Sequence, residues 1–169
     1  TLALSDVREY IRELLDVEYL RVLVSLVSDP KGESAVACEE VQLRASQCLL
    51  LLGQFLGGEF YLMLLTCQTC LITLSTFLNC RYHERSGTSE SSRPIQSSMR
   101  TLQMLVFACN YDVKFGKMIS DNHSLKNSIQ RCEESNDGRD LRTAVSWSWA
   151  GLSVSALGHV LMQKLRDHA

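Results

Sequence analysis

Apolar residues recur every three or four positions along most of this chain, the spacing that places them on one face of an α-helix. No segment shows sustained alternation of apolar and polar residues followed by a turn pair, so the pattern predicts no β-strands. The 169 residues include only two prolines and nine glycines, which also favours long helices. We therefore expect an all-α protein that forms a single domain over residues 1–169.

The helical pattern divides into several segments. The first begins at the capping residue Asp6 and stops at Pro30, and Asp16 is a point of division into two shorter helices. Further segments cover residues 34–56, 59–79, 95–109, 113–119, 124–132 and 141–166. The small, polar residues 84–94 predict a mobile loop. The positions expected to face the core are Val7, Ile11, Leu14, Leu15, Val22 and Leu26; Val41, Ala45, Cys48, Leu52 and Phe55; Phe60, Leu64, Cys67, Leu71, Leu74 and Leu78; Ile95, Met99, Leu102, Val106 and Cys109; and Val145, Trp149, Leu152, Ala156 and Val160.

The pattern repeats within the chain. Shifted by 54 residues, "VQLRASQCLLLLGQFLGGEFYLMLL" lies over "IQSSMRTLQMLVFACNYDVKFGKMI", with the same order of long helix, break, shorter helix and break. Leu51 then meets Leu105, and Leu71 meets Leu125. The segment "LRTAVSWSWAGLSVSALGHVLMQKL" is a candidate start for a third unit.

These units resemble armadillo repeats. "MRTLQMLVFACNYDVKFGKMISDNHSLKNSIQRC" carries the resemblance most clearly, and "VQLRASQCLLLLGQFLGGEFYLMLL" is similar but looser. The resemblance implies an armadillo/HEAT-like α-solenoid fragment of about three repeat units, which would bind a partner's helix or extended segment. One feature departs from the family. Armadillo proteins that clamp extended peptides resemble one another in carrying an Asn on the groove-lining helix, and neither "LQMLVFA" nor "LLLLGQF" contains one.

The stretch from Phe60 to Cys80 contains no charged residue and is long enough to cross a membrane. Four threonines, Thr66, Thr69, Thr73 and Thr76, recur within it at spacings of three and four, which would place them on one face of a single helix. This composition favours a buried repeat helix over a membrane span. The uncharged threonine face is then covered either by another helix of the domain or by a partner.

The seven cysteines lie mostly inside apolar runs, which is typical of buried free thiols in a reducing compartment. "CQTC" at 67–70 invites a zinc or a redox interpretation. Zinc requires four ligands, and no second closely spaced Cys or His pair exists. A redox pair belongs at a helix start, whereas the periodicity places this one in mid-helix. We therefore expect structural thiols, with no metal and no cofactor.

The remaining composition argues against several function classes. The net charge is −2 and the basic residues are dispersed, so nucleic-acid binding is not expected. The sequence contains no P-loop, no glycine-rich dinucleotide turn and no serine nucleophile elbow, and its four histidines are isolated. We expect a protein that is not an enzyme and has no small-molecule substrate.

The function expected from the resemblance is that of a scaffold, an assembly subunit of a larger complex in the cytoplasm or nucleus. Within the armadillo-like group the chain resembles assembly factors of centrioles or of meiotic complexes. The candidate partner-binding residues are Thr69, Thr73, Thr76, Arg100, Lys114 and Trp147. Trp147 would be an exposed aromatic anchor if no helix of the chain covers it.

Two alternatives from other classes stay open, a secreted helical bundle of the cytokine type stapled by disulfides and a membrane-associated helical protein. A homodimer seam is a third use for an apolar face. The chain starts "TLALSD" without a methionine, which suggests a piece of a longer protein.

Overall fold

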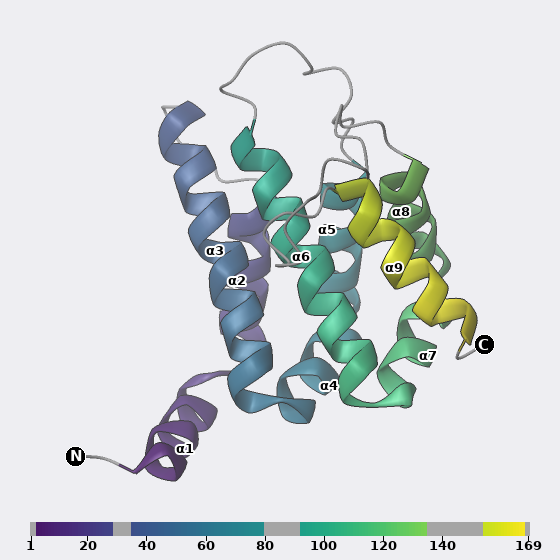
Figure 1. Ribbon diagram of the computed structural model, residues 1–169. Coiled ribbons are helices and arrows are strands. Elements are labelled where there is room, and N and C mark those ends of the chain that lie inside the picture. The colour runs from purple at the N-terminus through teal and green to yellow at the C-terminus, as the bar shows by residue number, and fades with distance from the viewer. Residues whose placement is uncertain (1–2, 29–34, 80–91, 135–153, 168–169) are drawn as a thin grey trace.

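The computed structural model of the protein describes residues 3–28, 35–79, 92–134 and 154–167 (Figure 1). Side chains are described throughout the first range, from residue 40 in the second, from 97 in the third and from 156 in the fourth. These ranges contain nine helices and no strand, so the expected all-α class is confirmed. The helices are α1 (Leu4–Leu14), α2 (Val17–Ser28), α3 (Ala35–Leu56), α4 (Gly58–Thr66), α5 (Gln68–Leu78), α6 (Ser92–Tyr111), α7 (Val113–Asp121), α8 (His123–Glu134) and α9 (Val154–Asp167).

Two helix breaks lie where the sequence predicts them. Asp16 separates α1 from α2 because its side chain accepts a hydrogen bond from the backbone N–H of Tyr19 at 2.8 Å, which caps α2. Gly57 separates α3 from α4 with a φ of 64°, a conformation that strains any residue with a Cβ. A Cβ at Gly57 would also lie only 2.8 Å from the ring of Tyr111.

The prediction of one helix over residues 59–79 is wrong, because the chain forms α4 and α5, which bend by 85° at Cys67. Cys67 has an extended backbone (φ −87°, ψ 102°), and its sulfur accepts a hydrogen bond from the N–H of Cys70 at 3.4 Å. No glycine or proline marks this break. Each half keeps its own apolar face, and all six positions expected to face the core are buried, namely Phe60, Leu64, Cys67, Leu71, Leu74 and Leu78.

A smaller correction concerns the polar segment 84–94. Its last three residues belong to the first turn of α6. Backbone N–H groups in the first turn of a helix have no partner within the helix, so the lack of an N–H in Pro94 costs no hydrogen bond. The rest of that segment lies outside the described residues, as does the part of the predicted last helix that precedes residue 154.

The helices form two layers (Figure 1). One layer consists of α2, α5 and α8 side by side, and the other of α3, α6 and α9, while α4 and α7 cross between the layers at one end. In chain order the described helices repeat one pattern three times. A short helix (α1, α4, α7) is followed by a medium one (α2, α5, α8) and then by a long one (α3, α6, α9). The starts of α7 and α8 follow those of α4 and α5 by 55 residues, one more than the apolar spacing suggests. In this register the buried Phe60 corresponds to the buried Phe115.

Ser128 links two helices of the first layer. Its hydroxyl is fully buried and lies 2.9 Å from the carbonyl oxygen of Ser75 on α5 and 2.9 Å from that of Ser124 on α8. We expect Ser128→Ala to lower the free energy of unfolding by about 1 kcal/mol, because the carbonyl of Ser75 loses its donor from α8 and keeps only the N–H of Asn79 at 3.1 Å. Urea denaturation followed by circular dichroism measures the change. The control, Ser124→Ala, alters an exposed hydroxyl on the same helix, and equal losses for both variants would contradict the interhelical role of Ser128.

Candidate functional site

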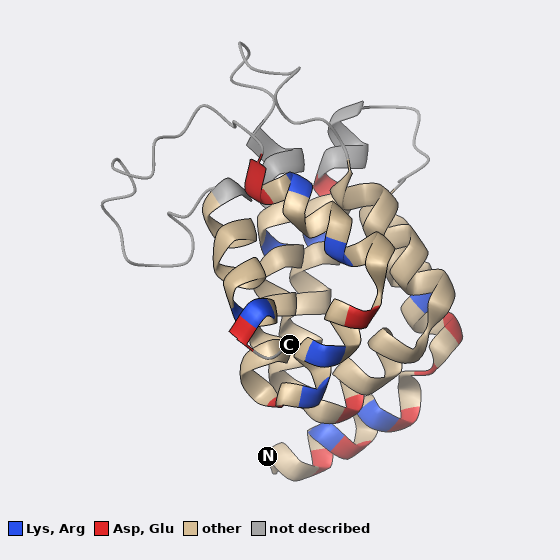
Figure 2. Cartoon of the chain, turned by 90° about the vertical axis from the view of Figure 1, so that its right-hand side faces the viewer, with Lys and Arg blue, Asp and Glu red and all other residues tan. Residues whose placement is uncertain are grey.

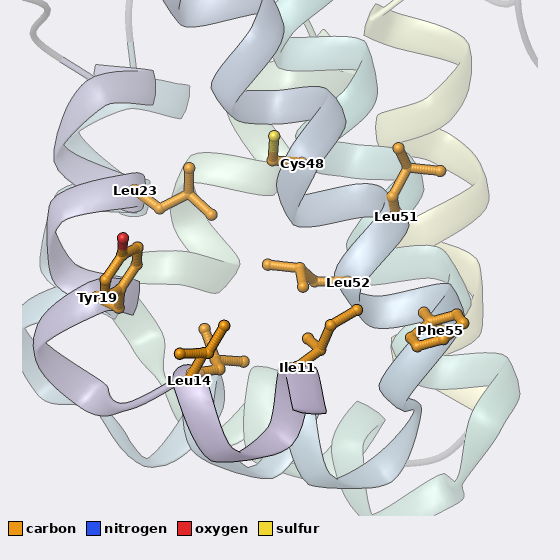
Figure 3. A pocket seen from close by; sticks show the side chains of 9 residues that line it. Ile11, Leu14, Tyr19, Leu23, Cys48, Leu51, Leu52 and Phe55 are labelled. Atoms are coloured by element: carbon orange, nitrogen blue, oxygen red, sulfur yellow. The ribbon is translucent and has the colours of Figure 1, made fainter. Parts of the chain in front are cut away.

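An apolar groove lies between α1, α2 and α3 (Figure 3). Its volume is about 460 Å³, and α1 with the turn after it, α2 and α3 all contribute side chains to its walls. The lining residues are Ile11, Leu14, Leu15, Tyr19, Leu23, Cys48, Leu51, Leu52 and Phe55. No charged side chain is among them. A concave surface of this composition and size is typical of a binding site for an apolar ligand or an apolar side-chain cluster.

The groove exists because α1 packs differently from the other two short helices. Helix α4 buries Phe60 and Leu64 and helix α7 buries Phe115 and Ile119, whereas α1 has no buried residue. Its apolar face, with Leu14 56% exposed, stays open next to α2 and α3. In Figure 1, α1 stands out from the body of the molecule. The surface that a tightly packed short helix would cover is therefore accessible.

Several apolar positions that the sequence predicts to lie in the core are instead exposed or half-buried on α1, α2 and α3. On α3 the buried face is formed by Ala45, Leu49, Leu50 and Leu56, while Cys48 is exposed and Val41 is 39% exposed. Helix α2 behaves in the same way and buries Leu20, Val24 and Val27. Its predicted core positions Val22 and Leu26 are 59% and 38% exposed. On α1 none of the predicted core positions is buried. Each of these helices carries more apolar surface than one core face requires.

Exposed apolar side chains concentrate at this end of the molecule. Among the described residues, nine of the thirteen large exposed hydrophobic side chains belong to α1, α2 and α3. Three of the nine, Leu14, Tyr19 and Leu51, line the groove. Exposed apolar side chains that gather in a groove are typical of an interaction site.

Several charged residues near the groove form ion pairs within the chain. Arg12 pairs with Glu9 at 2.7 Å and with Glu59 of α4, so it ties α1 to the body. Arg21 pairs with Glu18 at 2.7 Å, and Arg44 pairs with Glu40 at 3.1 Å. The guanidinium of Arg8 lies 5.5 Å from the ring centroid of Phe55. Figure 2 shows acidic and basic residues interspersed on another side of the molecule as well. The rim has no strong field of one sign.

The threonines predicted to bind a partner share one side of α5. Thr69 and Thr76 are exposed and Thr73 is half-buried, so the described helices do not cover this face completely. The hydroxyl of Thr73 donates to the carbonyl of Thr69 at 2.9 Å, and that of Thr76 donates to the carbonyl of Ile72 at 2.9 Å. Thr66 lies on α4 beyond the bend, so the predicted single face of four threonines is wrong.

The other predicted contact residues are not brought together. Arg100 is half-buried on α6, and Lys114 is exposed at the start of α7, with its amine 5.1 Å from the ring centroid of Phe115. Trp147 lies outside the described residues. None of the described candidates lines the groove. One sequence signal could have identified the groove. The segments of α1 to α3 carry more apolar residues than one buried face needs, and the periodicity predicts all of them to lie in the core.

The "CQTC" pair lies at the start of α5 and not in mid-helix. Burial raises the pKa of Cys67, but hydrogen bonds from the thiol and N–H of Cys70 and from Arg21 outweigh that effect and hold the pKa below its ordinary value. Burial, with the hydrogen bond to Cys67, raises the pKa of Cys70 to about 12. Both are free thiols, as are Cys48 and Cys109, and the thiol of Cys132 donates a hydrogen bond to the carbonyl of Leu78 at 3.4 Å. Cys80 and the side chain of Cys38 lie outside the described residues.

The structure also bears on the metal-site and membrane-span interpretations of this stretch. Across the described part of the chain, no group of three or more His, Cys, Asp or Glu side chains is placed to hold a metal ion. No single helix there is long and apolar enough to cross a membrane, and α4 with α5 reaches that length and composition only as a pair bent by 85°.

Comparisons of the chain with protein-family models, with curated proteins and with solved structures found no match.

Proposed function

We propose that this protein is a non-enzymatic scaffold that binds an amphipathic helix of a partner protein in the groove between α1, α2 and α3. The single observation that carries the proposal is the groove itself, which has a volume of about 460 Å³ and no charged lining residue. The threefold order of short, medium and long helices supports an armadillo-like arrangement, in which repeated helices offer an extended surface to other proteins. Residence inside the cell, as an assembly subunit of a larger complex, belongs to the same proposal.

The spacing of the lining residues favours a helix as the occupant. On α3, Cys48, Leu51, Leu52 and Phe55 follow one another at steps of three, one and three, which is the ridge pattern of a helix face. Tyr19 and Leu23 form a matching pair one turn apart on α2. A partner helix with apolar residues at i, i+3, i+4 and i+7 could interdigitate with these ridges. Because no side chain that lines the groove is charged, the contact would rest on apolar burial.

The test compares two variants that each carry a glutamate in place of an exposed aliphatic residue, one in the groove and one outside it. Leu51 is 61% exposed and lines the groove, whereas Ile72 is 63% exposed on the threonine side of α5. Because both side chains are largely exposed, Leu51→Glu and Ile72→Glu should leave the fold intact, which circular dichroism checks. A photo-crosslinking amino acid in place of Phe55 captures the partner in cells, and mass spectrometry identifies the crosslinked segment.

We expect that segment to come from another protein and to have helical apolar spacing. A synthetic peptide of the segment should bind the Leu51→Glu variant at least about tenfold more weakly than the native chain, because the charge is forced into an apolar contact. Binding to the Ile72→Glu variant should change by less than about twofold. Fluorescence anisotropy measures both. The reverse order of effects would place the contact on the threonine face of α5, and a crosslink to a second copy of the chain would contradict a heterologous partner.

A further inference from the structure

The three medium helices begin with the same kind of cap. Asp16 precedes α2 and accepts the N–H of Tyr19 at 2.8 Å, and Asn122 precedes α8 and accepts the N–H of Leu125 at 2.9 Å. At the corresponding place before α5 stands Cys67, whose sulfur accepts the N–H of Cys70 at 3.4 Å. In all three caps the acceptor is a side chain and the donor is the third residue after it.

A cysteine is an unusual residue for this position. Asp, Asn, Ser and Thr are the common caps because their oxygens accept hydrogen bonds well, whereas a neutral thiol is a weak acceptor. A thiolate is a better acceptor, and its negative charge lies favourably at the positive end of the helix dipole. The cap of α5 therefore stabilises the deprotonated form of Cys67, which can take the place that the carboxylate of Asp16 has before α2.

A cation from the neighbouring helix acts in the same direction. Helix α2 packs beside α5, and the positive charge of Arg21 on α2 favours the thiolate and lowers the pKa of Cys67. Arg21 is in turn paired with Glu18 at 2.7 Å. The groups that act on the ionisation of Cys67 are thus Arg21 from α2 and Cys70 from its own helix. Together with burial they leave the pKa of Cys67 below its ordinary value.

Cys70 complements Cys67. It lies in the first turn of α5, 1% exposed, and its pKa is raised to about 12, so it remains protonated at neutral pH. Residues three apart at a helix start lie close enough for a disulfide, which requires Cα atoms about 4.4–6.8 Å apart. Cys67 itself is 7% exposed, but it lies at the bend between α4 and α5, where Thr66, Gln68 and Thr69 are all exposed.

We propose that Cys67 and Cys70 form a reversible dithiol site that exchanges with low-molecular-weight disulfides such as oxidised glutathione. The Cys67 thiolate attacks one sulfur of glutathione disulfide, so a mixed disulfide forms at Cys67 and one glutathione thiolate leaves. The Cys70 thiol then loses its proton and attacks the Cys67 sulfur, which forms the Cys67–Cys70 bond and releases the second glutathione. Two protein thiols are oxidised, and one glutathione disulfide is reduced to two glutathione molecules. The site does not depend on the groove being a binding site.

The first experiment equilibrates the 169-residue chain in buffers of increasing oxidised-to-reduced glutathione ratio. After acid quenching and alkylation, peptide mass mapping identifies each cysteine's state. We expect an internal disulfide in the peptide that contains Cys67 and Cys70, while Cys109, buried and with a pKa raised to about 11, stays reduced. In Cys70→Ser the mixed disulfide with glutathione should accumulate at Cys67. Absence of the internal disulfide at every ratio, with native circular dichroism, would overturn the proposal.

The second experiment keeps the test valid if Cys70→Ser does not fold. Arg21 is exposed, so Arg21→Gln should fold normally. We expect iodoacetamide to alkylate Cys67 of the native chain with a rate that levels off at a lower pH than for free cysteine, because the thiolate forms earlier. In Arg21→Gln the plateau should move to higher pH, and the rate at neutral pH should fall several-fold. An unchanged pH profile in Arg21→Gln would show that Cys67 is an ordinary structural thiol.

Discussion

Replacing Phe115 with alanine is expected to lower the free energy of unfolding by about 3–5 kcal/mol, the usual cost of removing a buried aromatic side chain. Phe115 is fully buried on α7, and its ring centroid lies 5.7 Å from that of Tyr61 on α4 and 6.2 Å from that of Tyr111 on α6. The substitution would therefore open a cavity where three helices meet. Guanidinium denaturation followed by circular dichroism measures the loss.

The control for this substitution is Val113→Ala, two residues earlier on α7. Val113 is 56% exposed, so its truncation should change the free energy of unfolding by less than about 0.5 kcal/mol. A loss below about 1 kcal/mol in Phe115→Ala would contradict the packing of α7 against α4 and α6. A second readout is the titration of Tyr61, whose pKa burial raises to about 12. The phenol of Tyr61 should titrate at lower pH once the cavity admits water.

A β-branched side chain at Gly158 should be nearly as damaging. Gly158 lies on α9 where a Cβ would approach the backbone nitrogen of Glu133 on α8 to 2.6 Å and the carbonyl carbon of Cys132 to 3.0 Å. These are main-chain atoms of a packed helix, so they cannot rotate away as the end of a side chain could. We expect Gly158→Val to lower the free energy of unfolding by about 3 kcal/mol, the upper part of the range for overpacking.

Thermal and urea denaturation test this expectation against Gln163→Val, which places the same side chain at an exposed site of α9. Replacing glycine with valine should itself favour the helix, whereas replacing glutamine should not, so a larger loss in Gly158→Val than in the control reports the contact between α8 and α9. That contact also carries the pair of His159 with Glu133 at 2.8 Å. Equal stability of the two variants would mean that α9 can move away from α8 without loss.

The sequence predicts the helices themselves well, because periodicity reports an apolar face directly. The division at Asp16 and the end of α3 before Gly57 follow from residues with known preferences. The break at Cys67 could not be predicted in the same way. A thiol is not among the usual helix caps, and the apolar spacing continues across the bend because both halves bury their faces in one core.

The candidate site was harder to predict than the fold. Periodicity shows that α3 has an apolar stripe through Cys48 and Leu52, but it cannot show that the stripe through Leu49 and Leu56 is the buried one. Only the position of α1 decides which stripe remains open. The position of the thiol pair at a helix start needed the structure as well. Only the 55-residue register of the structure, one residue longer than the apolar spacing suggests, makes Cys67 correspond to Asn122, a conventional cap.

The buried apolar side chains of α2 to α9 form one core that extends along both layers of helices. In the first layer α5 packs on α2 and α8, and in the second α6 packs on α3 and α9. If the helices act as stacked repeats, as proposed above, each group of helices is stabilised mainly by the groups beside it. The docking of a helix at α1 would then reach α9 through the helices between them, α4, α5 and α6 among them. Local opening would therefore begin at an end of the row, and a bound partner at α1 would protect the near end most and the far end least.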